Sequence, residues 1–177
     1  MSVVVDVMTT QNPNALKFVL KKKLIKNKVV SYESPSAAAS DPLAKSLFGI
    51  EGIKSVWYSE RFITLEKHDE ISWGKVQKSL VEIMQTFDFE KLKEVESKPD
   101  EYPPVIAEAN AIIQTKILPY LVNDGGAIKI VGFDEHSIKL KFIGACSDCG
   151  VSKESTLKMI KKTLIRELRE PLEIKIL

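Results

Sequence analysis

The chain has 177 residues, of which 44% are hydrophobic and 28% are charged, and its formal net charge at pH 7 is +2. This composition predicts a folded protein with one medium core or two small ones, and it excludes a disordered chain. The charge is too close to neutral to indicate a nucleic-acid partner, and no apolar run is long enough to cross a bilayer. We therefore expect no nucleic acid and no membrane among its partners.

The N-terminal half, taken as residues 1–87, predicts a small mixed α+β domain. Residues 15–20 have the pattern of a strand. Asp41 is followed by proline, and this pair predicts a helix over 42–48, since Asp is a good N-cap and proline fits the first helical position. Two glycines shortly after residue 48 then end the helix.

The rest of this domain predicts a hairpin followed by an amphipathic helix. Residues 53–58 and 61–66 are rich in Val, Trp, Tyr, Phe and Thr, which is typical of paired strands. Ser72 is placed to cap the next helix. The apolar residues of that helix recur at steps of three and four and form one face against a sheet. They are Trp73, Val76, Leu80, Ile83 and Phe87.

Residues 88–101 are rich in charge and lead into three prolines, a composition that indicates a linker with at most a short helix. We therefore place a domain boundary there and assign a second domain to residues 102–177. The three prolines are Pro99, Pro103 and Pro104.

The second domain begins with an apolar helical face that runs to about Leu121. Pro119 is expected to limit or kink this helix, because proline lacks an N–H group and crowds the preceding turn. The segment 123–126, Asn-Asp-Gly-Gly, then turns the chain. The apolar face consists of Val105, Ala109, Ile112, Ile113, Ile117 and Leu121.

Two alternating segments predict a second hairpin. Apolar residues at 128–130 and 138–142 alternate with lysines, so each strand has one buried and one solvated face, and the turn falls at 134–136. A last helix precedes Pro171, and residues 172–177 predict a final edge strand. The apolar stripe of the helix is Leu157, Ile160, Leu164 and Leu168. The fold class is therefore α+β, with two small domains that each pack helices on a short sheet.

The only two cysteines, Cys146 and Cys149, form one C-x-x-C motif. Two thiols at this spacing can hold one edge of a metal site or close one disulfide. An all-cysteine zinc site or iron–sulfur cluster needs four thiolates, so a chain with one pair completes such a site only with a second chain. If the motif binds metal, we expect the site to be shared.

The start of the sequence and the number of cysteines indicate the cellular compartment. Residues 1–6 have neither the basic start and apolar stretch of a secretion signal nor the Arg-rich and Ser-rich character of a transit peptide. One tight cysteine pair also differs from the disulfide framework of a small secreted protein. We therefore expect a cytoplasmic protein, in which this pair is metal-binding or redox-active.

The motif lies after a predicted strand that ends at Ile143 and at the N-terminus of the last helix. Unpaired N–H groups and the helix dipole favour an anion there, such as a thiolate or a sulfide-bearing cluster. Lys153, one turn further on, is read as a solvated residue more readily than as an electrostatic aid. Asp148 is read as a helix cap rather than as a metal ligand, since Asp is a common N-cap.

These residues resemble a known family. The segment 118–126, followed by two strands and by 144–149 with its basic helix, resembles the Nfu domain, the C-terminal module of NifU-type iron–sulfur proteins. The resemblance covers about residues 105–175. A lone C-x-x-C is a weak signal, whereas one placed after Asp-Gly-Gly and a hairpin is specific.

The N-terminal half carries a second resemblance. Residues 11–18, 42–48 and 50–56 resemble the N-terminal domain that accompanies the Nfu domain in Nfu-type scaffold proteins. Both domains, in this order, cover nearly the whole chain.

The resemblance implies a scaffold or carrier, not an enzyme, that holds a 4Fe-4S cluster between two protomers and passes it to apo-proteins. Its ligands would be Cys146 and Cys149, and its partners a second copy of the chain, apo iron–sulfur client proteins and an upstream cluster donor. The chain departs from the family where Gly150 follows the second cysteine in place of the usual proline, and where Asp148 stands in place of a frequent glycine. These changes bear on cluster stability and transfer rate.

Two other functions use the same motif. A thiol–disulfide oxidoreductase would attack a disulfide with one thiolate and resolve the intermediate with the other, but a thioredoxin-like βαβ setting is not predicted around the cysteines. A structural zinc site bridging two chains would also use four thiolates. We rank both below the cluster carrier.

Other candidate residues give weak signals. His68 and His136 are read as exposed loop histidines, because neither has a partner at ligand spacing. The lysines at 21–23, with Lys26 and Lys28, are read as a solvated face or a site for an acidic protein, since no aromatic residues are interleaved for base stacking.

Overall fold

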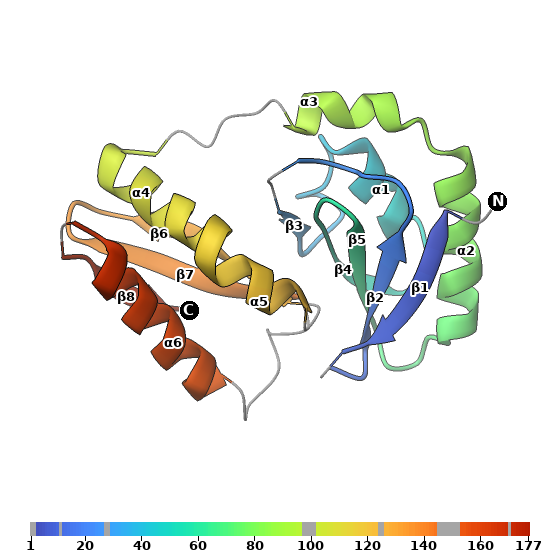
Figure 1. Ribbon diagram of the computed structural model, residues 1–177. Coiled ribbons are helices and arrows are strands. Elements are labelled where there is room, and N and C mark those ends of the chain that lie inside the picture. Colours follow the sequence, from blue (N-terminus) through green and yellow to red (C-terminus); the bar gives the residue numbers. More distant parts are fainter. Residues whose placement is uncertain are drawn as a thin grey trace. The chain divides into compact units, whose positions relative to one another are not determined.

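The computed structural model describes residues 3–10, 12–26, 29–96, 102–123, 126–144, 153–169 and 171–177. It divides into two compact units, Met1–Lys98 and Pro99–Leu177 (Figure 1). Each unit has its own sheet, core and helices, which confirms the α+β class with two small domains. In the described part of the chain, no helix combines the length and apolar character needed to span a bilayer.

The N-terminal unit contains a five-stranded antiparallel sheet with the order β1-β2-β5-β4-β3. The predicted strand at 15–20 and the predicted hairpin are confirmed. The second strand of the hairpin begins and ends one residue later than predicted. The outer strands β1 and β3 were not predicted, because β3 is too short to show a period and β1 leaves most of its side chains exposed. The strands are β1 (Val4–Thr9), β2 (Ala15–Leu20), β3 (Val30–Tyr32), β4 (Ile53–Tyr58) and β5 (Phe62–Lys67).

Two helices, α1 (Pro42–Phe48) and α2 (Trp73–Thr86), supply the apolar side chains that complete the N-terminal core. The predicted core face of α2 is confirmed, since Val76 and Leu80 are fully buried and Trp73 packs at the margin. Gly52, with φ of 77°, has the left-handed conformation that glycine permits after α1.

The segment expected to be a linker is partly packed on this core. Residues 89–96 form a short 3-10 helix, η1 (Phe89–Leu92), and a one-turn helix, α3 (Lys93–Glu96). Leu92 and Val95 are buried in the N-terminal core, which is why the compact unit extends to Lys98. Charge-rich composition concealed these two anchors, because each is a single apolar residue between charged neighbours in the sequence. The functional domain limits 1–87, 88–101 and 102–177 stay a prediction.

The C-terminal unit contains a three-stranded sheet with the order β6-β7-β8. The predicted hairpin is confirmed as β6 (Gly126–Phe133) and β7 (Ser137–Gly144), and the predicted edge strand as β8 (Glu173–Ile176). Strand β8 runs parallel to β7, with Ile138 opposite Ile174. The long helix between β7 and β8 makes this parallel return possible.

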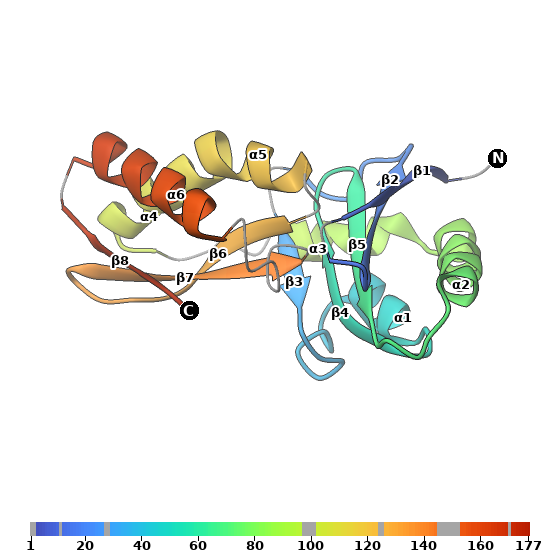
Figure 2. The same ribbon diagram turned by 90° about the horizontal axis from the view of Figure 1, so that it is seen from below.

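All helices of this unit lie on one face of its sheet (Figure 2). They are α4 (Pro104–Ile112), η2 (Ile113–Ile117), α5 (Leu118–Asn123) and α6 (Lys153–Glu167). Pro119 does not end the helical run, since it is the second residue of α5. A π-helical turn, η2, precedes it, and the Leu118 N–H bonds to the Ile113 carbonyl, five residues back. The wider turn accommodates a proline that would crowd a regular α-helix.

The N-terminal unit is tied together by the buried carboxylate of Asp41. One oxygen accepts the backbone N–H groups of Leu43 and Ala44 at 3.0 Å each, which confirms the predicted cap. The other accepts the Tyr58 hydroxyl at 2.5 Å, which links α1 to β4. Burial, together with this carboxylate, raises the pKa of the Tyr58 hydroxyl and also that of Tyr32. Both tyrosines therefore remain neutral donors beside the carboxylate.

We predict that Asp41→Ala destabilises the N-terminal unit by about 3 kcal/mol, because it removes a cap and leaves buried donors without an acceptor. Urea unfolding followed by tryptophan fluorescence measures this, since both tryptophans, Trp57 and Trp73, lie in this unit. Asp88→Ala is the matched control, because Asp88 caps η1 at an exposed position and should cost about 0.5–1 kcal/mol. Equal losses for the two variants would contradict the structural role of Asp41.

Candidate functional site

The strand ends that adjoin two sequence motifs pair with each other at one end of the C-terminal sheet. Gly126, the first residue of β6, pairs with Gly144, the last residue of β7. The residue that ends the Asp-Gly-Gly segment, Gly126, therefore lies directly beside the strand end that precedes the cysteine segment, whereas Asp124 and Gly125, where a turn was predicted, lie outside the described residues. The two motifs are about 20 residues apart in the sequence, and the antiparallel register pairs the strand residues next to them.

Cys146 and Cys149, with Ser147, Asp148 and Gly150, lie outside the described residues. The described neighbours fix the ends of their segment, since β7 ends at Gly144 and α6 begins at Lys153. The predicted order of strand, cysteine motif and helix is therefore observed, with Lys153 as the first residue of α6.

The start of α6 gives the cysteine segment a favourable electrostatic surrounding. A helix of this length, 15 residues, has a partial positive charge at its N-terminus, and its first N–H groups have no partner within the helix. Thiolates or an anionic cluster in the preceding segment would be stabilised by this end of the helix.

The elements that flank the segment are firmly packed. Ile160 and Leu164 of α6 are fully buried in the C-terminal core. Lys116 of η2 and Glu167 of α6 form an ion pair at 2.5 Å, and this contact, followed by that with Arg166, lowers the pKa of the Glu167 carboxyl. Both ends of the cysteine segment are thus held by elements of one core, although the exposed ion pair itself adds little stability.

The other candidate residues occupy the surroundings that the sequence predicts. His68 and His136 are both exposed in loops. Among the residues that the structure describes, no group of three or more His, Cys, Asp or Glu side chains is arranged to hold a metal ion. Within that part of the chain, therefore, nothing competes with the cysteine motif as a metal site.

The basic run at 21–23 is solvated, as expected. All three lysines are exposed, Lys23 forms an ion pair with Glu60, and the Lys22 ammonium lies 4.2 Å from the centre of the Phe89 ring. These contacts belong to the surface of the N-terminal unit itself, and they give no indication of base stacking.

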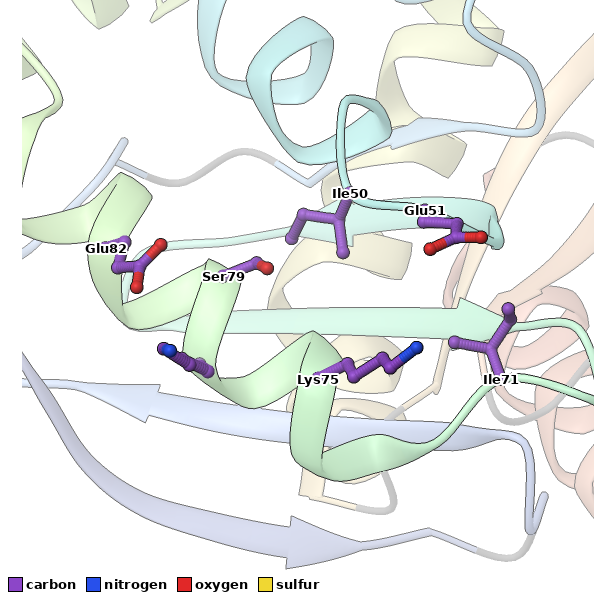
Figure 3. A pocket seen from close by; sticks show the side chains of 7 residues that line it. Ile50, Glu51, Ile71, Lys75, Ser79 and Glu82 are labelled. Carbon is purple, nitrogen blue, oxygen red and sulfur yellow. The ribbon is translucent and has the colours of Figure 1, made fainter.

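A shallow pocket lies on the N-terminal unit between α2 and the segment that follows α1 (Figure 3). Its volume is about 280 Å³. Its lining contains no cysteine or histidine, and its two lysines are balanced by two glutamates, so it indicates no particular ligand. The lining residues are Ile50, Glu51, Ile71, Lys75, Lys78, Ser79 and Glu82.

Comparison with protein families identifies both units. A family model described as "Scaffold protein Nfu/NifU N terminal" matches residues 5–90. A second model, described as "NifU-like domain", matches residues 110–175. The two matches lie in the order that the sequence resemblance implied, and the second spans the cysteine motif.

The names of similar curated proteins also contain NFU1 or NifU. The chain is 31% identical over 153 residues to the human "NFU1 iron-sulfur cluster scaffold homolog, mitochondrial", covering 82% of this chain and 60% of that protein. It is 26% identical over 179 residues to "NifU-like protein 5, mitochondrial" of Arabidopsis thaliana, covering 94% of this chain and 65% of that protein. The chain therefore spans less than two thirds of either relative's length.

A solution structure of a NifU-like protein from Saccharomyces cerevisiae is 21% identical, with a TM-score of 0.41. The alignment covers 55% of this chain and 87% of that chain.

The expectation of a cytoplasmic protein is wrong by this comparison, since the relatives from human and Arabidopsis are both named as mitochondrial. The expectation depends on the character of residues 1–6 and on a reducing environment for the cysteine pair. A targeting segment takes no part in the folded domains, and a C-x-x-C motif needs reduced thiols and not one particular compartment. Neither observation could therefore assign the location.

We predict that a fragment of residues 99–177 folds alone, because the C-terminal unit has a continuous core of its own. Circular dichroism should show a cooperative thermal transition. A fragment that begins at Pro104 is the matched control, since it lacks Tyr102, whose ring packs edge-on against Phe133 at 5.9 Å. It should be less stable by about 1 kcal/mol. A fragment of 99–177 without a cooperative transition would contradict an independent unit.

Proposed function

Because the chain belongs to the Nfu/NifU family, with both of its domains in order, we propose that it is an iron–sulfur cluster scaffold or carrier. Cys146 and Cys149 are the cluster ligands in this proposal, and the cluster is cargo that the protein receives and passes on. The names of the human and Arabidopsis relatives support the same class of function.

One observation carries the proposal. The only two cysteines of the chain follow the end of β7 in the sequence and precede α6, and the pairing of Gly126 with Gly144 puts the end of β7 next to the start of β6, where the Asp-Gly-Gly segment ends. A thiolate pair at the N-terminus of a helix is suited to an anionic cluster, and the surrounding elements supply a fixed base for it.

The ligand count leads to a dimer. A 4Fe-4S cluster takes four thiolates, and one chain has two, so two protomers share one cluster. No further ligand from the described residues is required. The cluster would lie between the chains, and the dimer would form with its binding.

Transfer follows from the nature of this site. Thiolates of an apo iron–sulfur client replace Cys146 and Cys149 one after another, and the cluster passes on without covalent change to the carrier chain. An upstream donor loads the site in the same way. The protein therefore acts without a turnover reaction of its own, and we assign binding and transfer to residues 102–177, the linker to 88–101 and the accompanying domain to 1–87.

A thiol–disulfide oxidoreductase is less well supported. The strand before the cysteines is the second strand of an antiparallel hairpin, with Ile128 opposite Phe142. The motif nevertheless lies in a βαβ arrangement, which the sequence did not predict, because β7, α6 and the parallel strand β8 follow one another. The local setting therefore does not separate the two functions, and the family match is what favours the carrier. The same assays that test the cluster carrier also test this function.

We predict that Cys146→Ser, and equally Cys149→Ser, abolishes cluster binding and cluster-dependent dimerisation together. Each leaves a shared site with two thiolates of the four that it needs. Light scattering measures the mass before and after anaerobic reconstitution, while iron and sulfide analysis gives the cluster content, with one four-iron cluster expected per two chains. The urea midpoint should remain unchanged, which separates loss of ligands from loss of fold.

Three outcomes would overturn the proposal. A stable monomer with a full cluster requires other ligands. Zinc in place of iron and sulfide after anaerobic purification indicates a structural zinc bridge. Catalytic disulfide reduction by the metal-free protein, lost in either cysteine variant, indicates the oxidoreductase.

We predict that Asp148→Gly raises the reduction potential of the cluster or slows its loss, because it removes a negative charge beside an anionic cluster. Asp148→Asn is the matched control, since it removes the charge and keeps an N-cap oxygen. Both variants should behave alike in voltammetry and in the decay of cluster absorbance. If neither property changes in either variant, Asp148 has no electrostatic role at the cluster.

A further inference from the structure

The open face of the C-terminal sheet carries an array of lysines that the strand register brings together. Lys129 of β6 lies directly opposite Lys141 of β7, and Lys139 of β7 lies directly opposite Lys175 of β8. Lys139 and Lys141 are two residues apart on one strand and therefore share a face. We call these four residues the sheet lysines.

The sheet lysines face away from the core of their unit. The residues that alternate with them, Ile128, Ile130 and Leu140, are buried under the helices on the opposite face (Figure 2). Lys129, Lys139 and Lys175 are exposed, and Lys141 is half-buried. The array is therefore open toward solvent at three of its four positions.

Nearby acidic groups neutralise only part of the array. Lys175 forms an ion pair with Glu173 at 3.0 Å. Within the described part of the chain, Lys129 and Lys139 form no ion pair. Neighbouring strands are about 4.8 Å apart, and residues two apart along a strand are about 6.7 Å apart, so the four ammonium groups occupy a small area of a rigid surface.

Like charges directly opposite each other destabilise a sheet. In the isolated chain, Lys129 and Lys139, which form no ion pair within the described residues, therefore each face a like charge across the strands. A partner that presents carboxylates at matching spacing removes the repulsion and gains attraction at the same time. A backbone held in a sheet also loses less conformational freedom on binding than a mobile segment does.

We propose that the sheet lysines form the docking surface for an acidic protein surface. The partner presents carboxylates spaced as on an extended strand, two residues apart. Docking is electrostatic, accelerates encounter and weakens with salt.

The face fits a protein better than nucleic acid or membrane. Among the described residues of β6 to β8, the large hydrophobic side chains that are exposed near the array include Val131, which is not aromatic. Phe133, at the hairpin end of β6, is also exposed, but its ring packs on Tyr102. Base stacking and membrane insertion both need such side chains.

The position of the array connects it with the proposed function. Lys129 and Lys141 each lie three residues from the paired ends Gly126 and Gly144, which is about 10 Å along the strands. A protein docked on the array is close to the cysteine segment that follows Gly144. That the docked protein gives or receives a cluster rests on the proposed function, whereas docking itself does not.

The test uses the full chain and a fluorescein-labelled peptide of alternating Glu and Thr, ten residues long, in fluorescence anisotropy at low salt. Lys129→Glu combined with Lys139→Glu should weaken binding at least tenfold. Lys158→Glu combined with Lys162→Glu is the matched control, because these exposed α6 lysines give the same change in net charge. The control should weaken binding less than threefold.

The same double variant should raise the melting temperature by roughly 2–6 °C, because each cross-strand repulsion becomes an attraction. A gain in stability with a loss of binding separates docking from damage to the fold. If the charge-reversed chain misfolds, Lys129→Gln combined with Lys139→Gln replaces it in the binding assay. This neutral variant should weaken peptide binding about fivefold.

Several results would overturn the proposal. One is the absence of peptide binding up to about 1 mM protein. A second is an equal loss of peptide affinity in the double variant of the sheet lysines and in the α6 control. A third is equal affinity for a peptide of the same composition whose glutamates stand in one block. Tighter binding of single-stranded DNA or of phosphatidylserine vesicles through the same lysines would replace the protein partner by another class. Cys146→Ser should leave peptide binding unchanged, so failure of the cluster function and failure of docking are distinguishable.

Discussion

The register of the β6–β7 hairpin is the constraint on which the C-terminal unit depends. Because Gly126 faces Gly144, the Asp-Gly-Gly turn and the cysteine segment start from the same end of the sheet. The same register places Ile128 against Phe142 on the core face and Lys129 against Lys141 on the open face. A shift by one residue would exchange the two faces, so packing of the isoleucines under the helices keeps the lysines on the open face and sets which strand residue precedes the cysteine segment.

The core also determines the course of the chain after the cysteine segment. Helix α6 leads to the parallel edge strand β8, and its buried residues pack in the core of the unit. The helix provides a partial positive charge where thiolates are needed. Strand β8, in turn, adds Lys175 to the open face beside Lys139. One core thus supports a proposed cluster site at its end and a proposed docking surface on its face.

The N-terminal unit is built on a different principle. Its core is closed around the carboxylate of Asp41, which caps α1 and accepts the Tyr58 hydroxyl from β4. A buried carboxylate with three donors fixes the helix against the sheet in one orientation. This unit contains no cysteine and, in its described residues, no cluster of metal-ligating side chains. Its resemblance to the family's N-terminal domain, and not its chemistry, connects it with iron–sulfur proteins.

The sequence by itself determined the elements whose signals are local. Alternation predicted the β6–β7 hairpin and the Asp-Pro pair predicted the start of α1, while the single C-x-x-C supplied the ligand pair that we propose. Tertiary structure decided what depends on partners distant in the chain. Leu92 and Val95 anchor a segment whose charges suggested a linker, a π-turn absorbs Pro119, and the pairing of β8 with β7 assembles the sheet lysines. Each of these depends on which strand or core lies nearby, and composition and periodicity carry no information about such neighbours.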